Sequence, residues 1–208
     1  TKLYILDTKI VIIYFCLKKM SMEKNKALLI IDIQNDYFEG GSNRLCGSEE
    51  AAIEASRLVK YFRIRNLPVV HVQHISTRAG ATFFLPDTIG AEIYHSVSPK
   101  DDEPVVIKHT PNSFFKTDLK SILDSMNITD LTVCGMMTHL CIDTTVRAAK
   151  DLGYNCTVVY DACATKGLKF QGESVKAKNV QLAFLAALHP YFAQICFVDD
   201  IVCGTQDN

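Results

Sequence analysis

Short apolar runs alternate along the chain with longer amphipathic segments. Residues 27–33 are apolar throughout except for Asp32, which is typical of a strand buried on both faces of a parallel sheet. Five further runs have the length and composition of strands, and they cover residues 68–75, 104–108, 131–135, 155–160 and 194–198. The pattern therefore predicts six strands.

Between these runs, apolar residues recur with the 3.6-residue period of a helix. In residues 48–66 the apolar side chains Ala51, Ala55, Leu58, Val59 and Phe62 lie on one face. Similar helices are predicted at 117–127, before Gly153, and before Pro190. Strands that alternate with helices predict an α/β fold in three layers, doubly wound, with helices on both faces of a six-stranded parallel sheet in the order 3-2-1-4-5-6.

This strand order also predicts where a ligand binds. In doubly wound sheets, ligands bind beyond the carboxyl ends of the strands, at the point where the strand order reverses. Here that point lies between the first and fourth strands. Asp32 follows the first strand and the segment GMMTHLC, residues 135–141, follows the fourth. We therefore expect both to lie at one edge of the sheet.

Composition argues against several classes of protein. With 208 residues, 48% apolar residues and a formal net charge of −1, the chain has the size of little more than one globular domain. It has no long Lys/Arg run, which argues against nucleic acid as a partner. Its eight cysteines include no CxxC pair, so neither a disulfide scaffold nor a zinc ribbon is indicated. We expect a cytoplasmic protein with reduced thiols.

The first 21 residues are predicted to be an N-terminal extension outside the working domain. Residues 10–17 form an apolar run far shorter than the roughly 18 residues that cross a bilayer, so no membrane partner is expected. The α/β pattern begins after Met22. We therefore expect an extension at 1–21 and a single domain at 22–208.

Cys141 is the candidate nucleophile. Thr138 is placed to cap the helix that follows the fourth strand, which would put Cys141 in its first turn. There the helix dipole, helped by a nearby cation, lowers a thiol pKa and favours the thiolate. The alternative is that Cys141 only packs in the core, as free cysteines often do.

Asp32 and Lys108 are the candidate partners of Cys141. Asp32 ends an apolar strand, where a buried carboxylate is costly unless another group pairs with it. Lys108 ends the third strand, roughly 9–10 Å from the first, a gap that a lysine side chain can largely bridge. The alternatives are a loop-bracing aspartate and a solvated lysine.

Three motifs in this order resemble one family. They are ALLIIDIQNDYF, VVIKHTPNSFFKTDL and VCGMMTHLCIDTTVRAAKDLGYNCTVVYDACAT. Over residues 26–202 the chain resembles the isochorismatase-like cysteine hydrolases, whose members include nicotinamidase and N-carbamoylsarcosine amidohydrolase. The catalytic Asp–Lys–Cys triad of that family falls on Asp32, Lys108 and Cys141.

The resemblance implies a mechanism. The Cys141 thiolate would attack a carbonyl carbon and form a thioester, while Asp32 would move the protons and Lys108 would hold both anions in their charged states. The family has a cis peptide upstream of the nucleophile, which falls on Met136–Met137. Its oxyanion hole would be formed by the backbone N–H groups of Met137 and Cys141.

The chain departs from the metal-binding nicotinamidases after the second strand. They have an Asp-x-His motif where this chain has HVQHISTR, and His71 and His74 are expected on opposite sides of their strand. We therefore expect no metal and no other cofactor, although a site near His74, His109 and His139 stays open. True isochorismatases lack the nucleophilic cysteine, so Cys141 argues against vinyl-ether cleavage.

Aromatic and polar residues near the motifs are candidates for the substrate pocket. The predicted pocket residues are Tyr37, Phe114, Thr138 and His139. For the aromatic residues near the motifs, which also include Phe83, Phe84 and Phe115, the alternative to a pocket wall is ordinary packing in the core or between subunits.

The predicted function is hydrolysis of a C–N bond in a small amide, carbamoyl or ureido compound by a homo-oligomer. An isochorismatase-type vinyl-ether hydrolase and a catalytically silent binding or assembly module are the alternatives.

Overall fold

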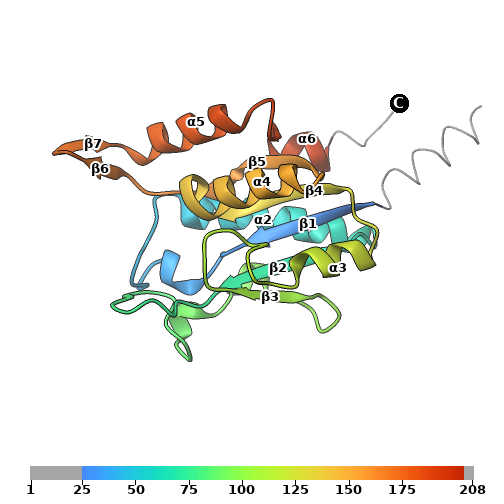
Figure 1. The fold of residues 1–208 in the computed structure, drawn as a ribbon, viewed down its shortest axis with the longest axis horizontal. Helices are drawn as coiled ribbons and strands as arrows, with labels where there is room; N and C mark the ends of the chain where they lie inside the picture. The colour runs from blue at the N-terminus through green and yellow to red at the C-terminus, as the bar shows by residue number, and fades with distance from the viewer. Residues whose placement is uncertain (1–24, 204–208) are drawn as a thin grey trace, which may run out of the picture.

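The computed structural model describes residues 25–203, so the predicted extension at 1–21 lies outside the described residues. Its central feature is a six-stranded parallel sheet (Figure 1). The strands are β1 (Lys26–Ile31), β2 (Val69–His74), β3 (Val105–Lys108), β4 (Asp130–Met136), β5 (Asn155–Ala164) and β8 (Gln194–Cys196). Their order, β3-β2-β1-β4-β5-β8, confirms the predicted arrangement.

Helices cover both faces of the sheet (Figure 1). They are α2 (Ser48–Ile64), α3 (Leu119–Ser125), α4 (Asp143–Asp151), α5 (Ala177–Leu188) and α6 (Val198–Val202). Alternate residues of β1 enter two separate cores: Leu28 and Ile30 pack in the core that contains α2, and Leu29 and Ile31 in the core that contains α3 and α4. A strand buried on both faces needs apolar residues throughout, which explains the continuous run in the sequence.

Several short elements were not predicted. Three of them are the 3₁₀ turns η1 (Asn35–Tyr37), η2 (Ile89–Ala91) and η3 (His95–Val97). An antiparallel hairpin of β6 (Leu168–Phe170) and β7 (Glu173–Val175) projects from the body (Figure 1). Each of these elements is three residues long, which is too short to show apolar periodicity. Within residues 25–203, no helix combines the length and the hydropathy that a membrane crossing requires.

A buried polar cluster fixes the amino end of β3, the strand that carries Lys108. The Glu103 carboxylate accepts two hydrogen bonds of 2.7 Å from the Arg63 guanidinium and lies 2.9 Å from Nε2 of buried His71. Burial disfavours the Glu103 anion, but hydrogen bonds from Arg63, the Lys100 N–H and His71 outweigh this and lower its pKa to about 2. Burial also lowers the pKa of His71.

This cluster predicts acid sensitivity. Both folded-state pKa values lie below the ordinary values of 4.5 for Glu103 and 6.5 for His71. Such groups stabilise the fold above the unfolded-state pKa and lose that contribution as the pH falls. We expect Glu103→Gln to lower the free energy of unfolding at pH 7 by about 1–3 kcal/mol and to flatten its decline below pH 4.5. Urea unfolding at pH 7 and pH 3.5 measures both effects. Exposed Glu173, replaced by Gln, is the control and should change neither.

Gly135 allows β4 to approach β1 closely beside the site. It pairs with Ile31, its φ is 131°, and a Cβ atom at this position would overlap the carbonyl oxygen of Ile31. Any other L-residue would force the two central strands apart. The pairing of Gly135 with Ile31, next to the site, therefore requires glycine at position 135.

We expect Gly135→Ala to destabilise the fold by about 2–5 kcal/mol, because it adds backbone strain and a collision with a strand. Gly153→Ala is the matched control: Gly153 also has a positive φ, of 95°, but a Cβ atom added there would meet nothing within 4 Å. It should lose about 1–2 kcal/mol through strain alone. Equal losses in urea unfolding would mean that the close approach of β4 to β1 has no energetic weight.

Candidate active site

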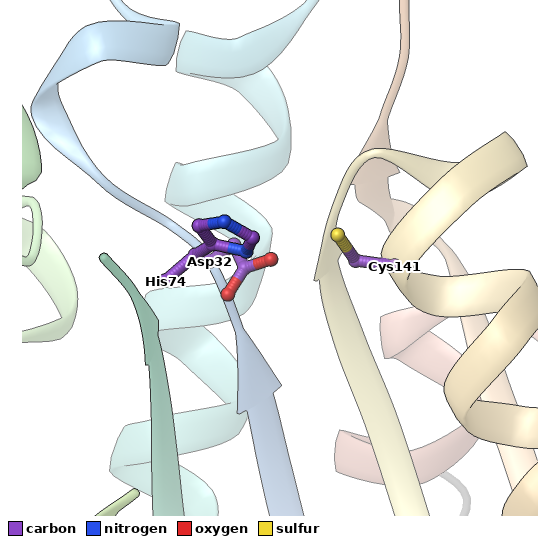
Figure 2. A group of neighbouring side chains, drawn as sticks. All are labelled: Asp32, His74 and Cys141. Atoms are coloured by element: carbon purple, nitrogen blue, oxygen red, sulfur yellow. The ribbon is translucent and has the colours of Figure 1, made fainter. Parts of the chain in front are cut away.

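Asp32 lies at the point where β1 ends and the chain turns away. Its N–H donates to Val72 O at 3.0 Å, which extends the pairing with β2 by one residue. Its φ is 52°, in the left-handed region that Asp tolerates better than most residues. The carboxyl group is fully buried, and one of its oxygens points toward Cys141 (Figure 2).

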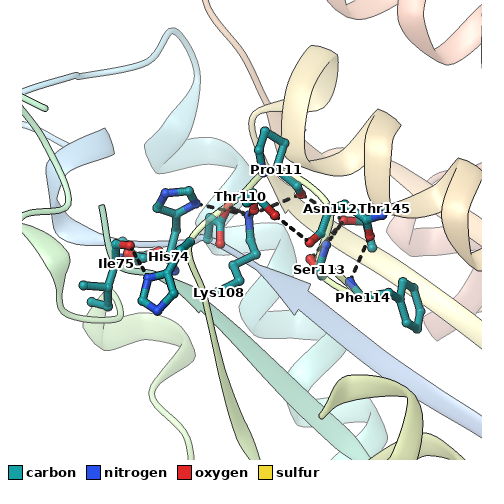
Figure 3. Close-up of polar contacts among 12 residues, drawn as sticks. His74, Ile75, Lys108, Thr110, Pro111, Asn112, Ser113, Phe114 and Thr145 are labelled. Carbon is teal, nitrogen blue, oxygen red and sulfur yellow. Dashed lines mark hydrogen bonds and ion pairs between the residues drawn. The ribbon is translucent and has the colours of Figure 1, made fainter. Parts of the chain in front are cut away.

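Lys108 is brought to Asp32 from the strand beyond β2. Its Nζ lies 2.8 Å from Asp32 Oδ2, and both side chains are 0% exposed. Nζ also donates to Thr110 O at 3.1 Å and lies 3.4 Å from both Pro111 O and His74 Nδ1 (Figure 3). Burial disfavours the charge, but the attraction of Asp32 and Cys141, together with their hydrogen bonds, outweighs it and raises the pKa of Lys108 above its ordinary value. The pair is therefore an ammonium and a carboxylate held together by mutual attraction.

Cys141 faces this pair from the opposite side of the switch point. It lies in η4 (Thr138–Ile142), a π-helical turn that runs into α4, and its side chain points toward Asp32 (Figure 2). A carboxylate oxygen of Asp32, a ring nitrogen of His74 and Cys141 Sγ all lie within 4.8 Å of one another. The structure thus brings together the three residues that the sequence predicted as a triad.

The expectation that the helix terminus lowers the pKa of Cys141 is wrong for this arrangement of the site. Burial, followed by the negative charge of Asp32, raises the pKa of the Cys141 thiol well above its usual range, although Lys108 acts in the opposite direction. Thr138 is also not the predicted cap, since Met137 occupies the N-cap position. The thiol is therefore protonated at neutral pH and needs a base.

A base is present. Within the described residues, Asp32 Oδ1 has no hydrogen-bond partner although it is fully buried. A protonated thiol beside a free carboxylate oxygen can transfer its proton to that oxygen, and the ammonium of Lys108 stabilises the anions on either side of the transfer. The arrangement can therefore generate a thiolate on demand.

The loop after β3 ties the two halves of the site together. Ser113 N–H donates to Thr145 Oγ1 at 3.0 Å, and Thr145 Oγ1 in turn donates to Pro111 O at 3.3 Å (Figure 3). Thr145 lies on α4, one turn beyond Cys141. These bonds connect the segment that surrounds Lys108 Nζ to the helix that follows the nucleophile.

The side chains around Cys141 do not form a site that suits a bound metal ion. Among residues 25–203, the one group of three or more potential metal ligands is Asp32, His74 and Cys141. The Lys108 ammonium lies against Asp32 and His74, so a divalent cation would meet a positive charge there. The other candidate histidines do not converge on it: His109 Nδ1 bonds to the carbonyl oxygen of Ile75, and His139 bonds to Thr165.

The four predicted pocket residues have different positions. Tyr37 is buried, its ring lies 4.6 Å from that of Phe84, and burial together with the charges of Cys141 and Asp32 raises its pKa. Tyr37 therefore shares the surroundings of the triad. Phe114 lies farther away: its ring stacks on Tyr154 at 5.8 Å and points away from Lys108 (Figure 3), so its place in a pocket stays a prediction. Phe114 is partly buried and packs against the apolar core. Contacts between aromatic rings stabilise side chains in such positions.

Thr138 and His139 precede Cys141 in η4, and among the described residues neither side chain bonds to Asp32, Lys108 or Cys141. Thr138 is fully buried and donates to Gln181 Oε1 at 2.9 Å, with Ala164 O at 3.2 Å. Nδ1 of His139 lies 2.5 Å from Thr165 Oγ1. The peptide bond Met136–Met137 is cis, as the resemblance implied. The role of the Met137 and Cys141 N–H groups in an oxyanion hole stays a prediction.

Gln34 shapes the site and was not among the predicted residues, whereas Phe84 was named among the aromatic candidates for a pocket wall. Gln34 is buried and holds the end of β2, donating to His74 O at 2.9 Å and accepting from His74 N–H at 2.8 Å. Phe84 is buried beside His74 and Tyr37, with a φ of 56° that is rare for an aromatic residue. The polar residue directly after a buried strand was a usable signal for Gln34.

The buried ion pair predicts a specific stability pattern. We expect Lys108→Met to cost about 3–5 kcal/mol, because it leaves the Asp32 carboxylate buried without a counterion. The double variant Asp32→Asn/Lys108→Met should lose less than the sum of the two single variants. Urea unfolding measures all three. The exposed pair Lys120–Asp124 is the control, and Lys120→Met should cost less than about 1 kcal/mol. Strict additivity at Asp32 and Lys108 would contradict the coupling.

Comparison with known proteins agrees with this fold. Residues 26–196 match the family model of the Isochorismatase domain. The chain is 50% identical over 169 residues to the isochorismatase family protein YddQ of Bacillus subtilis, covering 81% of this chain and 94% of YddQ. It is 33% identical over 147 residues to a streptothricin hydrolase of Streptomyces noursei, covering 67% of this chain and 50% of that protein.

A solved structure shows the same architecture. The crystal structure of an isochorismatase hydrolase candidate from Oleispira antarctica superposes with a TM-score of 0.84 at 48% identity, covering 88% of this chain and 98% of that one. The family model, the sequence identity and the fold therefore lead to one conclusion. The chain belongs to the isochorismatase-like cysteine hydrolase family.

Proposed function

We propose that this hydrolase cleaves a C–N bond in a small amide, carbamoyl or ureido compound through a covalent thioester on Cys141. The observation that carries the proposal is the buried contact of Lys108 with Asp32, at 2.8 Å, together with the Asp32 carboxylate that faces Cys141 (Figure 2). An acid–base group, a fixed cation and a nucleophile are the set that acyl transfer to sulfur requires.

The first half of the proposed reaction forms the thioester. Asp32 Oδ1 takes the proton from Cys141 Sγ while Sγ attacks the carbonyl carbon, and the carbonyl oxygen becomes an oxyanion. The backbone N–H groups of Met137 and Cys141 would donate to that oxyanion. The protonated Asp32 then gives its proton to the leaving nitrogen, the C–N bond breaks, and an amine or ammonia departs.

The second half regenerates the enzyme. Asp32 takes a proton from a water molecule, whose oxygen attacks the thioester carbon. The C–S bond breaks, and the proton on Asp32 returns to Sγ. The acid product leaves, and Lys108 stays positively charged throughout. A raised thiol pKa supports this sequence, because the resting thiol then holds the proton that the leaving group needs.

The burial of the triad supports a small substrate. Asp32 and Lys108 are 0% exposed and Cys141 is 3% exposed, so little of the reacting surface is open to bulk water. Aromatic Tyr37 and Phe84 lie beside it, and a compact planar group would pack against them better than a polymer would. The relative named streptothricin hydrolase supports hydrolytic chemistry, although the chain matches only half of its length.

The test of this proposal is release of ammonia or amine from a panel of amides, ureides and carbamoyl compounds. We expect Cys141→Ala to reduce turnover roughly a thousandfold or more, because it removes the nucleophile. Cys156→Ala, which removes another buried thiol, is the matched control and should retain activity. Mass spectrometry of the quenched reaction should show the acyl group on Cys141.

Two outcomes would overturn the proposal. Turnover that survives in Cys141→Ala would exclude the covalent route. If the wild type cleaves an isochorismate-type vinyl ether and hydrolyses no C–N bond in the panel, the protein is a vinyl-ether hydrolase instead. Absence of both activities, in a protein whose Cys141 also resists alkylation, would favour a silent binding module.

A further inference from the structure

The strand next to the nucleophile departs from regular pairing. β4 and β5 pair Val133 with Val158 and then Gly135 with Cys163, so two steps along β4 correspond to five along β5. The extra residues of β5 form a bulge whose carbonyl groups are not all used by β4. A buried carbonyl without a donor is costly, so the bulge needs hydrogen bonds from elsewhere.

Gln181 of α5 supplies these hydrogen bonds. Its Nε2 donates to Tyr160 O at 3.1 Å and to Cys163 O at 2.9 Å. Its Oε1 accepts from the Thr138 hydroxyl at 2.9 Å. Both amide hydrogens and the amide oxygen are therefore engaged. The reverse orientation of the amide would place its oxygen against two carbonyl oxygens, so only one orientation fits.

The hydrogen bond from Thr138 to Gln181 links α5 to η4, the turn that contains Cys141. Thr138 is the first residue of η4 and is fully buried, and Cys141 follows three residues later in the same turn. α5 also packs against η4 through Phe184, whose ring lies 5.8 Å from that of His139. One amide thus joins the β5 bulge, α5 and the start of the turn that carries Cys141.

We propose that Gln181 is a positioning residue, which fixes the position and orientation of η4 so that Cys141 Sγ faces Asp32. It lies on a different element from the triad, and its hydrogen bonds run to Thr138 and to two backbone carbonyls. It acts on the thiol only through Thr138 and the backbone of η4. The kinetic consequence of this assignment rests on the proposed C–N hydrolysis.

Gln181→Met tests the assignment because it keeps the length of the side chain and removes all three hydrogen bonds. We expect kcat to fall about tenfold or more, with KM within about threefold, because misplacing a reacting group by an ångström costs turnover more than binding. Thr138→Val should act in the same way, and Thr138→Ser, which keeps the hydroxyl, should behave like the wild type. The double variant Gln181→Met/Thr138→Val should be little worse than either single variant.

A second readout does not depend on the substrate. The rate of iodoacetamide alkylation at Cys141, followed by peptide mass spectrometry at fixed pH, should fall about tenfold in Gln181→Met. The reason is that the thiol loses its alignment with the base. Gln194→Met, the same substitution at an exposed position of β8, is the control and should leave that rate unchanged. Only variants that unfold cooperatively well above the assay temperature are compared.

The outcomes separate this assignment from the proposed function. Slower alkylation in Gln181→Met, without turnover of any compound by the wild type, would support the positioning role and count against C–N hydrolysis. Unchanged or faster alkylation in a folded Gln181→Met would overturn the positioning role whatever the substrate is. A rise in KM with an unchanged kcat would also overturn it, because it would place Gln181 in substrate binding.

Discussion

The ion pair between Asp32 and Lys108 is the interaction on which the site depends. Both groups are fully buried, and burying two charges costs several kcal/mol per ion before their attraction offsets it. An apolar pair of similar volume would serve stability equally well. The charges make sense as a device for chemistry, because they place a carboxylate and a fixed ammonium beside the Cys141 thiol.

The fold meets this requirement through strand order. β1 carries Asp32 and β3 carries Lys108, with β2 between them, so the long lysine side chain reaches across one strand to the carboxylate. On the other side, Gly135 lets β4 lie close enough to β1 for the turn after β4 to present Cys141. The loop after β3 then joins α4 through Ser113 and Thr145, so the two halves of the site are held by hydrogen bonds as well as by the sheet.

Burial and nearby charge raise the pKa of the Cys141 thiol in the resting site. Burial and the charge of Asp32 hold the Cys141 thiol in its protonated form, in contrast to cysteine enzymes whose nucleophile rests as a thiolate. The same burial strengthens the attraction between Asp32 and Lys108, so the Asp32 carboxylate is held firmly where it faces Cys141.

The architecture and the three central residues could be predicted from the amino-acid sequence alone. Continuous apolar runs indicate strands buried on both faces, the 3.6-residue period indicates the helices, and their alternation leads to the observed strand order. Strand ends in such a sheet meet at one edge, and the resemblance to the isochorismatase-like cysteine hydrolases selected Asp32, Lys108 and Cys141 among the residues there. Short elements such as η1 and the β6–β7 hairpin left no periodic signal, so the sequence did not reveal them.

The contacts and pKa values of the side chains around the triad could be seen only in the tertiary structure. Phe114, a predicted pocket residue, stacks on Tyr154, Thr138 binds Gln181 instead of capping its helix, and the thiol pKa rises where a helix terminus alone would lower it. These outcomes depend on residues that are far apart in the chain and meet through tertiary packing. Burial and long-range hydrogen bonds are set by the whole packing arrangement, and no local pattern records them.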